Sequence, residues 1–304
     1  GWARWVPRDH NVTYKLWTNG ATVGAVGIDR DSEFLVAGDS SGELWRWNLG
    51  SKSDWSAKSL GTMVPAEGRD GASVNGLAFS FDGSWLAAVG EGGRVNLWRT
   101  DKDWLREAPA GLTLPSSIWG VAFDPESKWL AIGGIGRKGP IKAFKMRDWT
   151  LVGETSVENG DIYALTFAQE LLVSGDSHGD LRSYTMPHLD FNTKKAMVQK
   201  GELNVWSVAT IRGNPDHVVS GNSDGIVRVW NPNSPDHILA KSSAEDALLN
   251  PTINSVAYNE RTRRIAASGD GNQVVEYDAD NPDPGSRGRL PSVQHFFGQE
   301  GNVW

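Results

Sequence analysis

One arrangement of apolar and polar positions recurs along the whole chain: two short apolar strands, a glycine-containing turn, and a third strand that ends in an aromatic residue. In one copy, the apolar segment 218–221 leads through the turn 222–225 into 227–230. Glycine supplies the positive φ that a tight hairpin needs, and Asn or Asp tolerates it. The β-branched and small residues around these turns favour closely packed strands. The pattern therefore predicts an all-β protein, and the aromatic residues that end the third strands are expected to lie in its core.

The strand that opens each copy is the clearest marker of the repeat. It occurs at residues 23–28, 74–79, 118–123, 162–167, 205–210 and 253–258, and another begins at 302–304. Successive copies start 43 to 51 residues apart. This is close to the roughly 40–45 residues of a four-stranded propeller blade with modest loop insertions. The period predicts a β-propeller of four-stranded antiparallel blades.

Two segments carry a resemblance to a known family. The segment 220–231, SGNSDGIVRVWN, resembles the core "SGSxDGTIRVWD" of WD repeats, and 77–83, LAFSFDG, resembles their "VAFSPDG". The likeness extends over six repeats, from about residue 22 to 297. It implies a single WD-type propeller over residues 1–304 whose exposed faces hold proteins or peptides.

The expected blades cover approximately 22–64, 73–107, 117–153, 161–199, 204–241 and 252–297. Residues 1–18 and 301–304 are expected to contribute to a shared, partial seventh blade, because an open ring would leave unpaired strand edges. Seven blades are the prediction, and six blades are the alternative.

The repeats also depart from the family pattern. The Gly-His pair that precedes the opening strand in regular WD repeats is absent from every copy. The turn aspartate survives as Asp224 but is replaced in the other copies. The usual His–Asp–Ser–Trp hydrogen-bond network therefore cannot form in its regular version, and we expect these degenerate blades to depend more on apolar packing.

Charge and composition narrow the classes of partner. The net charge is −7, and no long Lys/Arg block is present, which disfavours nucleic acid as a partner. There is no cysteine, which suits the cytoplasm, and no apolar run approaches the ~18–20 residues that span a bilayer. The first residues lack an initiator Met and a signal-peptide pattern, so we expect the sequence to be cut from a longer chain.

Motifs of catalysis and ligand binding are absent from the sequence. The glycine-rich segment 133–139 is predicted to be a hairpin turn, not the phosphate loop that opens a helix. The acidic turns 270–272 and 278–281 lack the spaced ligands and closing Glu of an EF-hand. We therefore expect no catalytic residue, no cofactor and no bound metal, and the chain is predicted not to be an enzyme.

The most informative feature is aromatic. The second residue of the opening strand is Trp119, Tyr163, Trp206 and Trp304 in four copies, and the resemblance places this residue at the channel rim. Trp, Tyr and Arg often dominate binding energy at interfaces. The candidate partner-binding residues on this rim are Trp119, Tyr163, Trp206, Trp304, Arg137, Asn75, Asn254 and Glu91. The competing interpretation is packing, because strict alternation places Trp119 on the same side as Val121 and Phe123.

These observations favour a non-catalytic protein-binding or ligand-sensing scaffold. The degenerate repeats resemble those of propellers linked to NTPase domains, which implies a larger multidomain signalling protein. The alternative is a lectin-like or small-ligand propeller that stacks sugar rings or apolar groups on the Trp-rich rim. A propeller enzyme is a third hypothesis, which a cluster of acidic residues or histidines around a metal would support.

Overall fold

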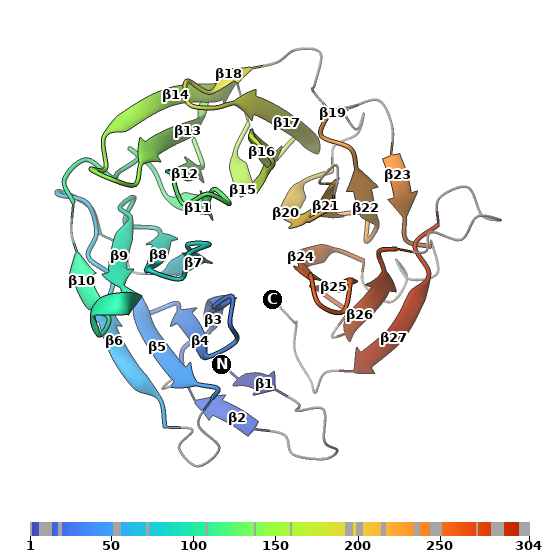
Figure 1. Cartoon of the computed structure of the whole chain (residues 1–304), viewed down its shortest axis with the longest axis horizontal. Helices are drawn as coiled ribbons and strands as arrows, with labels where there is room; N and C mark the ends of the chain where they lie inside the picture. The colour runs from blue at the N-terminus through green and yellow to red at the C-terminus, as the bar shows by residue number, and fades with distance from the viewer. Residues whose placement is uncertain are drawn as a thin grey trace. The chain divides into compact units, whose positions relative to one another are not determined.

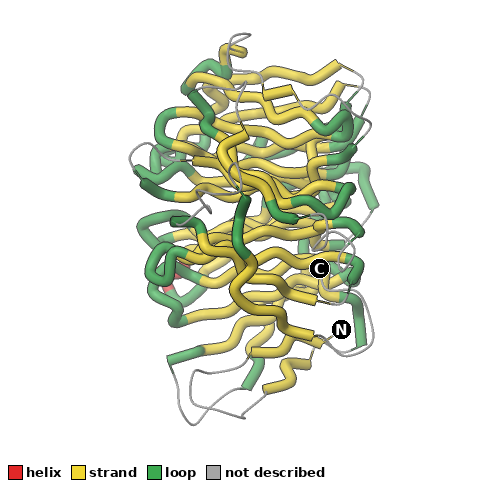
Figure 2. Tube along the Cα trace, turned by 90° about the vertical axis from the view of Figure 1, so that its right-hand side faces the viewer, coloured by secondary structure: helices red, strands yellow, loops and turns green. Residues whose placement is uncertain are grey.

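The computed structural model describes most of the chain. The described residues are 2–5, 14–17, 20–50, 56–70, 73–107, 109–136, 138–158, 160–191, 197–198, 203–213, 217–233, 238–243, 251–271, 273–280 and 289–297. The chain forms two compact units, Gly1–Lys128 and Trp129–Trp304. Strands and loops make up both units, and the helix in the described residues is the short 3-10 turn η1 (Thr100–Lys102), drawn in red (Figure 2).

The first unit contains two complete blades and the opening strand of a third. Blade 1 consists of β3 (Val23–Ile28), β4 (Phe34–Asp39), β5 (Glu43–Asn48) and β6 (Lys58–Thr62). Blade 2 consists of β7 (Val74–Phe79), β8 (Trp85–Gly90), β9 (Asn96–Arg99) and β10 (Leu105–Glu107). Within each blade, the strands pair antiparallel in sequence order.

Blade 3 begins with β11 (Ile118–Phe123) and continues through β12 (Trp129–Gly134), β13 (Lys138–Lys145) and β14 (Leu151–Glu158). Blade 4 consists of β15 (Ile162–Ala168), β16 (Leu171–Asp176), β17 (Asp180–Thr185) and β18 (Asp190–Phe191), and β19 (Met197–Val198) also pairs with β17. The outer strand of blade 4 is therefore made in two pieces, which pair with the two ends of β17.

The second unit ends with two further blades. Blade 5 consists of β20 (Val205–Ile211), β21 (His217–Asn222), β22 (Val227–Trp230) and β23 (Ile238–Lys241). Blade 6 consists of β24 (Ile253–Asn259), β25 (Arg264–Gly269), β26 (Gln273–Asp278) and β27 (Ser292–Phe297). All six predicted opening strands are confirmed, as β3, β7, β11, β15, β20 and β24.

The prediction of seven blades is wrong, and the six-blade alternative is supported. The N-terminal strands β1 (Trp2–Trp5) and β2 (Tyr14–Trp17) pair with each other in a separate two-stranded sheet, with Trp2 opposite Trp17. A blade needs four hydrogen-bonded strands, and this sheet has two. Residues 301–304, which were expected to complete it, lie outside the described residues.

Apolar packing between successive blades forms the core of each unit. In blades 1 and 2, the opening strands β3 and β7 pack against each other, and so do β15, β20 and β24 in the second unit (Figure 1). The second strand of each blade is almost fully buried, and an aromatic residue is buried at the end of each third strand. These aromatic residues are Trp47, Trp98, Phe144, Tyr184, Trp230 and Tyr277. The structure thus places them in the core, as the sequence predicts.

Blade 5 keeps part of the hydrogen-bond network of regular WD repeats. The indole Nε1 of Trp230 donates to Ser220 Oγ over 2.9 Å, and Ser220 Oγ donates to Asn222 Oδ1 over 3.0 Å. Asp224 holds its turn by accepting from the backbone N–H of Ile226 and by pairing with Arg228. Without the family histidine, the network ends at Asn222.

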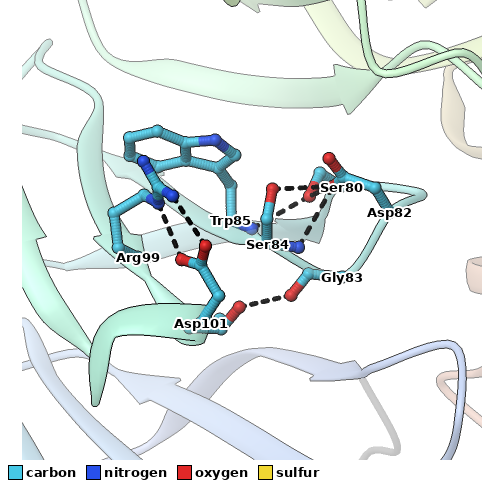
Figure 3. A network of polar contacts seen from close by, with 8 residues as sticks. Ser80, Asp82, Gly83, Ser84, Trp85, Arg99 and Asp101 are labelled. Carbon is cyan, nitrogen blue, oxygen red and sulfur yellow. Dashed lines mark hydrogen bonds and ion pairs between the residues drawn. The ribbon is translucent and has the colours of Figure 1, made fainter.

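In blade 2, a polar network fixes the turn between β7 and β8 (Figure 3). Ser80 Oγ and Ser84 Oγ both donate to the carboxylate of Asp82, at 2.6 and 2.8 Å. Arg99 lies over the Trp85 ring and makes two charge-assisted hydrogen bonds with Asp101. Burial alone would raise the pKa of Asp82, but the hydrogen bonds from Ser80, Ser84 and Ser127 outweigh burial and lower it.

Replacing Asp82 by Ala is expected to cost about 1 kcal/mol at neutral pH, because the hydrogen bonds to this exposed carboxylate are lost. Because the pKa of Asp82 is lowered on folding, its stabilisation is present above the ordinary carboxyl pKa. It disappears as the pH falls through the lowered value. Urea unfolding of both proteins at pH values from neutral to about 3 measures this difference. An Asp82→Asn control keeps an acceptor, and a pH-independent difference would contradict the prediction.

Candidate functional site

A β-bulge lies at the second position of the opening strand in five blades. In blade 4, Ile162 is opposite Asp176 and Ala164 is opposite Gly175, so Tyr163 is the extra residue. The bulged residues are Gly24, Asn75, Tyr163, Trp206 and Asn254. A bulged residue is left out of the ladder, and its side chain is re-aimed. Strict alternation of inward and outward side chains therefore does not hold at these bulged positions. A bulged residue need not pack on the same side of the sheet as the residue two positions later.

A repeated backbone hydrogen bond joins each bulged end to the inner turn of its own blade. The N–H of Glu91 donates to the carbonyl of Ser73, and the N–H of Ser177 donates to that of Asp161. Equivalent bonds are Ser40 to Thr22, Ser223 to Asn204, and Asp270 to Thr252. In each of these blades, the turn tip therefore lies at the same end as the bulge.

In the second unit, the bulged aromatic residues of neighbouring blades stack. The rings of Tyr163 and Trp206 have centroids 4.5 Å apart and an interplanar angle of 29°. Both residues are partly exposed. The Trp206 Nε1 atom is covered and has no hydrogen-bond acceptor among the described residues. The structure thus brings together two of the predicted aromatic residues from different strands.

Asp161 ties this aromatic pair to the turn of blade 3. Burial raises the pKa of the Tyr163 phenol, and the charge of Asp161 and its hydrogen bond to Tyr163 raise it further. The phenol therefore remains a protonated donor at neutral pH. Asp161 Oδ1 also accepts from the backbone N–H of Gly136 over 2.7 Å. This arrangement orients the Tyr163 ring.

The other polar residues of the second unit's bulged ends add negative charge. Asn254 Nδ2 donates to Asp270 Oδ1 over 2.8 Å. In blade 4, the carboxylates of Asp176 and Asp180 share one guanidinium, that of Arg182, at 3.1 and 2.8 Å. Burial raises the pKa of Asp180, and the charge of Asp176 raises it further. The sequence pattern does not reveal this carboxylate pair, because its members become neighbours only through the hairpin.

In the first unit, the corresponding ends of the opening strands carry a different set of side chains. Trp119 is 37% exposed, although it lies in a strand whose flanking residues, Ile118 and Gly120, are buried. The Asn75 Nδ2 atom donates to the carbonyl of Ile118 over 3.3 Å. Ser117 Oγ donates to the carbonyl of Glu91 over 3.4 Å. Asn75, Trp119 and the backbone of Glu91 thus lie in one hydrogen-bonded neighbourhood.

Two predicted site residues, Arg137 and Trp304, lie outside the described residues. Among the residues that the structure describes, no group of His, Asp and Glu is arranged to hold a metal ion. Over the same part of the chain, none of the helical structure is long and apolar enough to cross a bilayer.

Comparisons with known proteins agree with the repeat pattern. The family model "WD domain, G-beta repeat" matches residues 59–99 and 194–231. The chain is 24% identical over 239 residues to dynein axonemal assembly factor 10 of Xenopus tropicalis, which covers 73% of this chain and 64% of that protein. The chain therefore spans less than two thirds of the length of this relative.

Solved structures resemble the chain over most of its length. The structure of U3-55K matches with a TM-score of 0.73 at 19% identity, over 92% of this chain and 83% of that chain. The crystal structure of Saccharomyces cerevisiae Sqt1 matches with a TM-score of 0.68 at 17% identity, over 91% and 75%. At these identities the likeness shows the fold alone. The two matched repeats and the four-stranded blades support one conclusion: the chain is a β-propeller that carries WD repeats.

Proposed function

We propose that the chain is a non-catalytic scaffold that binds protein partners through the bulged ends of its blades. The observation that carries this proposal is the stacked pair Tyr163–Trp206, which occupies two bulged positions and remains partly exposed. A bulge re-aims a side chain while the strand stays paired on both sides of it, so these rings are presented on paired strands.

The chemistry of the pair suits a protein interface. Large aromatic rings bury much area at low entropic cost, and they are enriched among the residues that dominate binding energy. Each ring restricts the other through stacking, and the Asp161 hydrogen bond fixes Tyr163, so little freedom remains to be lost on binding. The Trp206 N–H is covered and has no acceptor among the described residues. A bound partner that offers it a backbone carbonyl would therefore add a hydrogen bond.

The name of the curated relative supports a scaffold that acts in assembly. The Xenopus protein is described as an assembly factor for axonemal dynein. For the present chain, we extend this only to the coarser role of bringing protein subunits together. Ligand sensing, membership in a larger multidomain signalling protein, and location in the cytoplasm are further parts of the proposal that follow from the sequence.

The test is a quantitative affinity capture from native lysate. The Tyr163→Ala/Trp206→Ala variant is expected to capture at least tenfold less partner than the unaltered chain, on the order of the loss of one hot-spot residue. The reason is that each central aromatic residue contributes a large share of the binding energy. A matched control is Leu151→Ala, which removes an exposed apolar side chain from the outer strand β14. Trp119→Ala, prepared separately, tests the first unit.

All variants are compared at equal thermal stability, so that unfolding does not mimic loss of binding. If the double variant and the Leu151→Ala control capture the same partners as the unaltered chain, the aromatic pair has a packing role and the proposed site is wrong. If a glycan array binds the unaltered chain and fails with the double variant, a lectin-like function replaces the scaffold.

A further inference from the structure

Three arginines of the first unit lie near the turn that precedes β9 in blade 2. Arg69 lies against Gly93, because a Cβ placed on Gly93 would be 3.5 Å from Arg69 Cδ. Arg94 follows Gly93 in the chain, and the carbonyl of Arg94 accepts from Asn96 Nδ2. Asn96 Oδ1 in turn accepts from Arg106. We call Arg69, Arg94 and Arg106 the arginine row.

The outer member, Arg106, is held in one orientation. Its Nη1 donates to the carbonyl of Thr62 over 2.9 Å, and its Nη2 donates to Asn96 Oδ1. The guanidinium lies over the Trp98 ring, 5.3 Å from the centroid. A guanidinium presents five N–H groups in a fixed fork, so these contacts leave donors available for a ligand.

The charges of the row are not neutralised by the described part of the chain. The Arg94 side chain has no hydrogen-bond or ion-pair partner there, and Arg69 donates to the carbonyls of Pro115 and Glu91. Burial lowers the pKa of Arg106, and the charge of Arg94 lowers it further, with no carboxylate opposing them. Glu107, the next residue, acts on Arg99 instead.

A partly buried guanidinium beside a second one is an unfavourable arrangement unless an anion joins it. The nearby carboxylates of Glu67, Asp70 and Glu91 are exposed, and none forms an ion pair with the row. The row is therefore prepared for a carboxylate that the described residues do not supply. Its inner end, Arg69, bonds to the carbonyl of Glu91, next to the neighbourhood of Trp119.

We propose that the arginine row binds an acidic peptide segment of a protein partner, with partner carboxylates on the Arg94 and Arg106 guanidiniums. This rests on the proposed function in that the anion is carried by a protein. It names the chemistry of that partner and adds a binding surface on blade 2.

A peptide fits this surface better than a nucleic acid does. Val64 is 44% exposed, and its backbone forms two hydrogen bonds with the Asn96 side chain, so an apolar side chain lies beside the guanidiniums. A segment that alternates acidic and apolar residues can use both features. Binding of a phosphate backbone requires many cationic contacts along its length, and the row offers three arginines.

The probe is a short fluorescent peptide that alternates Glu and Val, titrated at low salt and followed by anisotropy. Arg94→Ala is expected to weaken binding about tenfold or more, because one charge-assisted bond is lost. Arg94 has no partner to lose, so its removal leaves the fold intact. Arg106→Lys keeps the charge but removes the fork, and it is expected to weaken binding as well. Arg30→Ala, an exposed arginine at the opposite end of β3, is the matched control.

The proposal is supported if binding of the Glu–Val peptide weakens with added salt and in the Arg94→Ala variant. Binding should be unchanged in Arg30→Ala and in Tyr163→Ala/Trp206→Ala. A Gln–Val peptide of the same length should bind weakly. Equal binding by unaltered and Arg94→Ala proteins, or no binding at all, overturns it and leaves the aromatic-pair proposal standing. Tighter, Arg94-dependent binding of a phosphoserine peptide or of a single-stranded RNA would assign the row to phosphate and also overturn it.

Discussion

Replacing Trp98 by Ala is expected to lower the free energy of unfolding by about 3–5 kcal/mol, the usual cost of deleting a large buried aromatic side chain. Trp98 is 1% exposed and packs with Val36, Leu44 and Leu86 of blades 1 and 2. The free energy of unfolding of a typical domain is about 5–15 kcal/mol, so this loss would remove a large part of it. Urea unfolding followed by circular dichroism measures it.

The exposed Trp119 provides the contrast. Trp119→Ala is expected to cost less than about 1 kcal/mol, because much of this side chain is already in water. Equal losses for Trp98→Ala and Trp119→Ala would show that Trp119 belongs to the core and would contradict its assignment to the binding surface. Trp98→Phe should fall between the unaltered chain and Trp98→Ala.

Replacing Gly269 by Ala is expected to destabilise the chain by about 3 kcal/mol or more, because a Cβ cannot be accommodated there. Its ideal Cβ would lie 1.7 Å from the carbonyl oxygen of Thr252, a backbone atom that cannot turn away. The close approach exists because Asp270 donates to that same carbonyl. Relief requires the inner turn of blade 6 to separate from β24, and thermal and urea unfolding should both report the loss.

Gly27→Ala is the matched control, since Gly27 also lies within a strand. Its Cβ would meet Phe79 at 3.5 Å and Leu77 at 3.6 Å, which are ordinary contacts. Its stability should therefore change by no more than about 0.5 kcal/mol. Similar losses for both alanine variants would indicate a general intolerance of strand glycines to substitution, not the contact with Thr252.

The repeat period allowed the opening strands and the buried third-strand aromatic residues to be predicted, because both follow from local alternation and from spacing. The blade count could not be predicted, since β1 and β2 match the strand pattern but, among the described strands, pair only with each other. The bulge at Trp206 could not be predicted either, because one extra backbone residue in a strand leaves no mark in the hydrophobic pattern.

The stack of Tyr163 on Trp206 and the arginine row depend on residues that different strands bring together. Arg69, Arg94 and Arg106 come from a loop, a turn and an edge strand, so no short motif contains them. Their neighbourhood is set by the side chain of Asn96, which holds Arg106 and the loop at Val64. Such sites become visible only when the hydrogen bonds are known.

The bulged positions separate the part of each repeat that can vary from the part that cannot. The residue before the bulge is Val or Ile in all five blades, while the bulged residue is Gly, Asn, Tyr, Trp and Asn. Gly24 cannot be exchanged, because a Cβ there would lie 2.2 Å from the carbonyl oxygen of Val74. The other four bulged residues carry side chains already, so the same frame can acquire new specificities by substitution at these sites. A combinatorial library randomised at Asn75, Tyr163, Trp206 and Asn254 would sample binding surfaces while sparing the scaffold.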